Sequence, residues 1–199
     1  MNESKLVKFI KKTFSAFGTL GYLIMSIPTR DCTGIKYSEK FYLSKKNTQE
    51  RQRYNECSAY STAFVLRHYG NEINGLQAYD KMKFKIPFSG YVLPKSIVQC
   101  MKSYDFKCKI FKGNMESLKT RLSEGKPVIV EIGQGFKWQH YMTLVGYDND
   151  KKEMYFFDSS KQPCESPNHS GNRTMSEEEF LKVWDNGLPW FNHMYIAII

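Results

Sequence analysis

The sequence predicts one globular domain that combines helices with antiparallel strands. Of its 199 residues, 41% are hydrophobic and 15% are aromatic, which provides enough apolar side chain for a core and argues against disorder. Apolar residues recur at helical spacing between Cys57 and Gly70. Further along, three short apolar runs are separated by polar turns, as is typical of strands in a sheet: Lys126–Ile132, Tyr141–Tyr147 and Glu153–Phe157.

The first 30 residues differ in character from residues 31–199, which we expect to form the domain. Met1–Lys12 is rich in lysine, and Thr13–Thr29 carries no charged residue. Such a segment predicts a signal or membrane anchor, an interfacial amphipathic helix, or a helix packed on the domain. It favours a membrane-associated or secreted location, with a cytoplasmic location as the alternative, and membrane association through residues 1–30 stays open.

The net charge of +9, from 29 basic and 20 acidic residues, does not indicate a nucleic-acid-binding protein. The lysines are scattered, and the chain has no zinc-finger, RNP-like or helix-turn-helix signature. Five cysteines follow no metal-binding or disulfide spacing, so we expect no structural zinc site: Cys32, Cys57, Cys100, Cys108 and Cys164. A disulfide between Cys100 and Cys108 stays open for an oxidising compartment.

Taken in order, residues 31–46 are predicted to form a connector with a short strand at Phe41–Leu43. Beyond the helix that starts at Cys57, the apolar spacing predicts helices over Leu76–Met82 and Pro94–Tyr104 and a strand over Phe106–Phe111. Asn114 is expected to cap a further helix, which Gly125 ends before the three strands.

Cys57 is the first candidate for chemistry, because a polar, turn-prone stretch leads directly into it and the helical pattern follows. At a helix N-terminus the unpaired backbone amides and the helix dipole favour a negative charge. A cysteine there is favoured as a thiolate, which is its nucleophilic form. Gln52 lies five positions upstream, and its side-chain amide is placed to donate to an oxyanion beside the backbone amide of Cys57.

His140 and Asp158 are the second and third candidates. His140 opens the strand Tyr141–Tyr147, and Asp158 closes the strand Glu153–Phe157. The turn Asp148–Lys152 makes these two strands antiparallel neighbours, so the start of one lies beside the end of the other. This arrangement predicts a histidine base oriented by a carboxylate, both held on rigid elements.

These residues, in this order, resemble the papain-like cysteine peptidases that process bacteriocin precursors at double-glycine leaders, and their stand-alone relatives. The resemblance covers Gln52–Ile199 and departs from the family at Ser58, where glycine is usual, and at Ser159, where proline often follows the aspartate. The features that carry it are Gln52, Cys57, the helix stop at His68–Gly70, the Gly125–Val128 strand start, His140, Val145–Asp148, Asp158, a closing helix at Met175–Trp184 and a last strand at Tyr195–Ile199.

The resemblance implies an α+β papain-like fold in which the helix of Cys57 packs on an antiparallel sheet bearing His140 and Asp158. It implies hydrolysis of a peptide or protein substrate by a Cys57–His140–Asp158 triad, with Gln52 in the oxyanion hole and no metal or organic cofactor. Two alternatives remain: an acyltransferase of transglutaminase type with the same triad, or a papain-like module that binds a peptide without catalysis.

Overall fold

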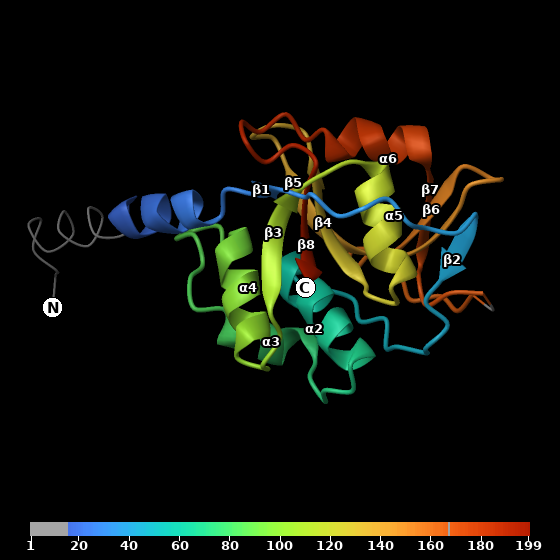
Figure 1. Cartoon of the computed structure of the whole chain (residues 1–199). Coiled ribbons are helices and arrows are strands. Elements are labelled where there is room, and N and C mark those ends of the chain that lie inside the picture. The colour runs from blue at the N-terminus through green and yellow to red at the C-terminus, as the bar shows by residue number, and fades with distance from the viewer. Residues whose placement is uncertain (1–15, 167) are drawn as a thin grey trace, which may run out of the picture.

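One eight-stranded sheet organises the protein (Figure 1). The structure is a computed structural model, and it describes residues 16–166 and 168–199. The strands are β1 (Thr29–Arg30), β2 (Lys40–Tyr42), β3 (Cys108–Lys112), β4 (Val128–Gly133), β5 (Gln139–Asp148), β6 (Glu153–Phe157), β7 (Arg173–Ser176) and β8 (Met194–Ile198). They follow the order β1-β3-β8-β4-β5-β6-β7, and β2 pairs with β5. Every pairing is antiparallel except that of β1 with β3.

Helices cover the sheet on both sides. They are α2 (Cys57–His68), α3 (Gly75–Lys81), α4 (Pro94–Lys102), α5 (Met115–Ser123) and α6 (Glu177–Trp184). In Figure 1, α2, α3 and α4 gather at one side of the sheet, and α5 and α6 lie at the other. Alternate residues of β4 enter two apolar clusters, since Val130 packs in one with residues of α5 and α6, and Ile129 packs in the other with residues of α3 and α4.

The helix α2 lies inside the molecule rather than on its surface. All ten residues from Cys57 to Leu66 are buried. Phe64 stacks on Phe157 of β6 with 4.4 Å between ring centroids, whereas Ala59 and Ala63 belong to the cluster that includes α3 and α4. A helix enclosed on every side is a rigid support for its first residue, because the surrounding core must move if the helix moves.

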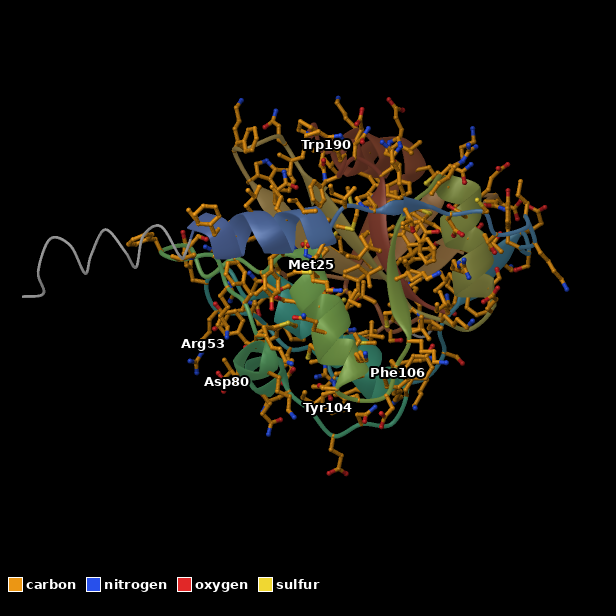
Figure 2. The ribbon with its side chains drawn as sticks, turned by 60° about the vertical axis from the view of Figure 1, so that its left-hand side comes forward. Met25, Arg53, Asp80, Tyr104, Phe106 and Trp190 are labelled. Atoms are coloured by element: carbon orange, nitrogen blue, oxygen red, sulfur yellow. The ribbon has the colours of Figure 1, made fainter. Side chains whose placement is uncertain are left out.

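Residues 16–25 form a helical stretch that packs on the domain beside α4 (Figure 2). Tyr22 stacks on Phe84 with 4.5 Å between ring centroids, and its hydroxyl donates to Gln99 Oε1 at 3.0 Å. Ser26 Oγ accepts from the backbone amide of Lys95, in the first turn of α4, at 2.9 Å. In the part of the chain that the structure describes, no helix has the length and hydropathy to cross a membrane. The predictions for Met1–Lys12 lie outside the described residues.

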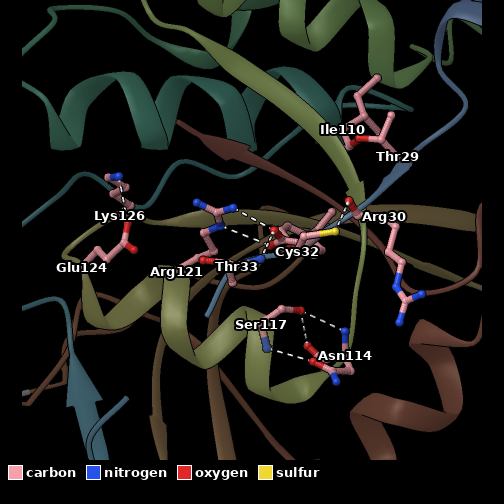
Figure 3. Close-up of polar contacts among 12 residues, drawn as sticks. Thr29, Arg30, Cys32, Thr33, Ile110, Asn114, Ser117, Arg121, Glu124 and Lys126 are labelled. Carbon is pink, nitrogen blue, oxygen red and sulfur yellow. Dashed lines mark hydrogen bonds and ion pairs between the residues drawn. The ribbon is translucent and has the colours of Figure 1, made fainter. Parts of the chain in front are cut away.

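Three helices begin with a reciprocal cap. Figure 3 shows the cap of α5, where Asn114 Oδ1 accepts from the amide of Ser117 and Ser117 Oγ accepts from the amide of Asn114, both at 2.9 Å. Ser176 with Glu179 does the same for α6, and Asn74 with Gln77 for α3. The cap at Ser176 also corrects the predicted closing helix: Met175 and Ser176 belong to β7, and α6 starts at Glu177.

The cysteines are all free thiols in this structure, including Cys100 and Cys108. Cys100 is a buried residue of α4, and Cys108 is half-buried on β3. Burial raises the pKa of Cys100 to about 11 and that of Cys108 to about 12, so both are neutral thiols near neutral pH. Neither is therefore suited to act as a nucleophile.

Candidate active site

Cys57 is the first residue of α2, as the sequence predicts, and only 3% of it is exposed. The N-cap of α2 is Glu56, which makes no side-chain capping hydrogen bond. The stretch before it turns sharply at Asn55, which has φ of 57° and whose side-chain amide donates to Ser89 O at 2.8 Å. No N-cap side chain therefore accepts a hydrogen bond from the first-turn amides of α2, in contrast to the capped helices α3, α5 and α6.

The structure brings His140 and Asp158 together. His140 is the second residue of β5, and Asp158 directly follows β6. His140 Nε2 lies 2.7 Å from Asp158 Oδ1, and the carboxylate is fully buried. The antiparallel pairing of β5 with β6 produces this contact, because it aligns Thr143 with Phe157 and so places both site residues at one end of the strand pair.

The buried carboxylate of Asp158 has further partners. Arg173 Nη1 donates to Asp158 Oδ2 at 2.7 Å, and the amide and hydroxyl of Ser160 donate to Oδ1 at 2.9 and 2.7 Å. Burial would raise the pKa of Asp158, but the hydrogen bonds from His140, Arg173 and Ser160 hold that pKa well below its usual range. Asp158 therefore stays charged, and neither oxygen is without a donor.

His140 also lies near Cys57. Burial lowers the pKa of His140, but the hydrogen bond with Asp158 and the influence of the neighbouring Cys57 outweigh it and raise the pKa to about 9. The imidazole therefore carries a proton near neutral pH. Because Nε2 faces Asp158, Nδ1 is the ring nitrogen left for Cys57. The imidazole is thus held by the carboxylate of Asp158, with the side chain of Cys57 nearby.

Gln52 is fixed by Ser159, the residue that follows Asp158. The backbone amide of Gln52 donates to Ser159 O at 2.8 Å, and Ser159 Oγ donates to Gln52 Oε1 at 2.7 Å. Because Oε1 is engaged, the amide nitrogen of Gln52 remains as the donor end of the side chain. Sequence reasoning missed this use of Ser159, which stood out only as a departure from a family pattern.

Sequence reasoning also missed a buried carboxyl group near Cys57. Glu131 lies on β4 within the apolar run Lys126–Ile132, and its Oε1 accepts from the hydroxyl of Tyr91. Burial, opposed by the hydrogen bond from Tyr91, raises the pKa of Glu131 to about 7. Burial and then the neighbouring Glu131 raise the pKa of both tyrosines well above its usual value.

An apolar pocket of about 170 Å³ adjoins this cluster. Tyr91 and Glu131 line it on one side, and Gln139, the neighbour of His140 in the chain, also borders it. Leu23 of the N-terminal helical stretch and Trp190 complete its walls. Within residues 16–166 and 168–199, no group of three or more histidine, cysteine or acidic side chains is placed to hold a metal ion.

Comparison with known proteins gives one family and several similar structures. The model of the Peptidase_C39 like family matches residues 39–187. No curated protein sequence matches the chain. The peptidase domain of Streptococcus ComA, a bi-functional ABC transporter involved in quorum sensing, superposes with a TM-score of 0.58 at 20% identity, covering 77% of this chain and 98% of that domain.

Two further structures are similar. A double glycine motif protease from an AMS/PCAT transporter, solved in complex with the leader peptide, gives a TM-score of 0.56 at 20% identity over 78% of this chain and 91% of its own. Xylellain, a cysteine protease from Xylella fastidiosa, gives a TM-score of 0.53 at 10% identity, covering 86% of this chain and 94% of its own. The predicted papain-like α+β fold, with the helix of Cys57 packed on an antiparallel sheet, is confirmed.

Proposed function

Because this chain belongs to the Peptidase_C39 like family and is a cysteine peptidase, we propose that Cys57, His140 and Asp158 form its catalytic triad and that Gln52 helps to stabilise the oxyanion. The observation that carries the proposal is the 2.7 Å contact between His140 Nε2 and the fully buried carboxylate of Asp158. It orients the imidazole and keeps it charged beside Cys57.

In the proposed reaction, the sulfur of Cys57 attacks the carbonyl carbon of the scissile peptide bond. The carbonyl oxygen becomes an oxyanion, which the amide of Cys57 and the side-chain nitrogen of Gln52 stabilise by about 3 kcal/mol per donor. The C–N bond then breaks, and His140 gives its proton to the departing amine. His140 next takes a proton from water, which attacks the thioester, and the C–S bond breaks to release the acid and Cys57.

We propose a peptide with two glycines before the scissile bond as the substrate. The double glycine motif protease that this chain resembles was solved with a leader peptide. In this chain the nucleophile itself is 3% exposed, which favours residues without bulky side chains next to the reacting carbonyl. The apolar pocket bordered by Tyr91, Gln139 and Trp190 is suited to an apolar side chain elsewhere in the peptide.

Alkylation by iodoacetamide, followed residue by residue with mass spectrometry, tests the proposal. We expect Cys57 to be labelled faster at pH 6 than Cys32 and Cys164, although those two are exposed and Cys57 is buried. Accessibility alone predicts the opposite order, so a fast Cys57 requires activation by its surroundings. Replacing His140 by alanine should abolish the advantage, whereas His193→Asn should preserve it.

Cleavage of a Gly-Gly peptide and of its Ala-Ala counterpart provides the second readout, with and without an added amine. We expect hydrolysis of the Gly-Gly peptide but not of the Ala-Ala peptide. Transfer of the acyl group to the added amine would instead identify an acyltransferase. If Cys57 is labelled no faster than Cys32 and no peptide is cleaved, the three residues have no catalytic role. The chain would then be a papain-like module that binds a peptide without catalysis.

A further inference from the structure

The helical stretch over residues 16–25 has two faces of different character. One face is held by the domain through the contacts of Tyr22 with Phe84 and Gln99, and through the hydrogen bond to Ser26 from the first turn of α4. These contacts fix the rotation of the stretch about its own axis. The direction in which the opposite face points is therefore set by the fold.

The opposite face is apolar and open to solvent. We call it the apolar face. Phe17, Leu20 and Ile24 share the three-to-four spacing that aligns side chains along a helix, and Met25 and Ile27 are exposed at its C-terminal end. Phe17 is 69% exposed and Ile24 is 58% exposed, so this short segment presents several large apolar side chains to solvent. Figure 2 shows Met25 on the side of the molecule that faces the viewer.

Charge identifies what covers this face. Residues 1–30 contain five basic residues and one acidic residue, and four of the basic residues are lysines that precede the apolar face in the sequence: Lys5, Lys8, Lys11 and Lys12. Arg30 follows it, and Thr13–Thr29 contains no charge. An apolar face flanked by cations matches a surface that offers anions above an apolar layer.

We propose that the apolar face docks on the surface of a bilayer containing anionic lipid, with the stretch lying in the plane of the interface. Its apolar side chains enter the boundary between headgroups and acyl chains, and the positive charge that the sequence carries before and after it attracts anionic lipid. The stretch does not cross the bilayer in this arrangement, in line with the absence of a spanning helix from the described residues.

A second copy of the chain is a poorer occupant for electrostatic reasons. Each copy carries a net charge of +9, so electrostatic repulsion opposes the pairing of two copies. The apolar face itself presents no carboxylate to the partner's cations, because residues 13–29 contain none. An anionic lipid surface instead attracts the positive charge that opposes binding of a second copy.

Sedimentation of the full chain with lipid vesicles tests this proposal. The probes are vesicles of phosphatidylcholine mixed with phosphatidylglycerol, and vesicles of phosphatidylcholine alone. The variant is Leu20→Gln with Ile24→Gln, which removes apolar side chains but keeps good helix formers. The matched control is Ile35→Gln, because Ile35 is 66% exposed on the connector after β1 and does not belong to the apolar face.

We expect the wild type to bind the anionic vesicles, with binding weakened by added salt and at least about tenfold weaker on neutral vesicles. The double variant should bind at least about tenfold more weakly than the wild type, and Ile35→Gln should bind equally well. Near-ultraviolet circular dichroism should be unchanged in both, because each substituted side chain is exposed.

Three outcomes would overturn the proposal: no binding of the wild type to anionic vesicles, equal binding by the double variant, or self-association in sedimentation velocity that only the double variant loses. The last outcome would assign the apolar face to a second copy. Peptide cleavage assayed on the same samples separates this proposal from the catalytic one, because cleavage does not require vesicles and vesicle binding does not require Cys57.

Discussion

The hydroxyl of Ser159 links the two halves of the proposed active site, since Ser159 fixes Gln52 and directly follows Asp158. In Ser159→Ala the side chain of Gln52 loses its orienting donor at Oε1. We expect kcat for a Gly-Gly peptide to fall by about tenfold, less than the 10²- to 10³-fold typical of removing an oxyanion donor itself, with KM unchanged.

Two measurements distinguish this positioning role from a general loss of structure. Alkylation of Cys57 forms no oxyanion, so its rate should be unaffected by Ser159→Ala. In a double-mutant cycle, Ser159→Ala should have no further effect once Gln52 is alanine. A slower alkylation, or additive losses in the cycle, would contradict the proposed role of Ser159.

The charge on His140 makes a pH-dependent contribution to stability. The pKa of His140 is about 9 in the folded protein and near 6.5 in an unfolded chain. The folded state therefore binds the proton more tightly, and the stabilisation is complete below about pH 6.5 and is lost as the pH rises to about 9. We expect a decrease of up to about 3 kcal/mol in the free energy of unfolding over this interval.

Urea denaturation of the wild type and of His140→Gln across this pH range measures the effect. The difference between the two proteins isolates His140 from other groups that titrate in the same range, such as the buried Glu131. The variant should lack the slope. A parallel decrease in both proteins would show that the slope does not originate at His140.

At the scale of elements, the cap of α5 should contribute to the stability of the fold but not to its activity. Asn114 caps α5 and lies on the surface, far along the chain from the proposed site residues. Replacing it by alanine should lower the free energy of unfolding by about 1 kcal/mol, because the amide of Ser117 loses its acceptor. Thermal unfolding measures the loss, and Asn114→Asp, which keeps the acceptor, is the matched control. Cleavage by either variant should match the wild type.

Most elements were predictable because their signals are local. The cap at Asn114, the stop at Gly70 with φ of 91°, and the apolar run in Glu153–Phe157 depend on neighbours in the chain. The two-residue strand β1 was not predicted, since Thr29–Arg30 becomes a strand only by pairing with β3, which is distant in sequence. The start of α6 was placed too early for the same reason, because β7 exists through its pairing with β6.

The proposed site also contains some residues that local signals predict and others that they do not. The sequence predicted Cys57, His140 and Asp158, because each stands at the start or end of a recognisable element, and Gln52 from its place on the segment that enters the helix of Cys57. Their catalytic roles stay a proposal. It did not predict Ser159, Arg173 or Glu131 as neighbours of these residues. Their contacts cross the sheet or join separate loops, and no spacing along the chain encodes them.

At the scale of the whole molecule, the site lies between two apolar clusters. The first includes Phe64 and Phe157, and the second includes Cys57, Ala63 and Tyr141. Since α2 contributes to both, the position of its first residue depends on packing over most of the domain. Leu23 of the N-terminal helical stretch packs against the second cluster, so the segment proposed to meet lipid is joined to the part of the molecule that contains Cys57.

The peptide hydrogen bond between Gln52 and Ser159 has a dynamic consequence. It connects the loop that enters α2 to the residue after Asp158, and Asn172 bonds both the amide and the carbonyl of Asp158. These backbone bonds tie the carboxylate and the amide side chain to one small unit of structure. A fluctuation that opens this unit separates Asp158 from His140 and Ser159 from Gln52 in one event. The population of molecules in which only one of these contacts is formed should therefore be negligible.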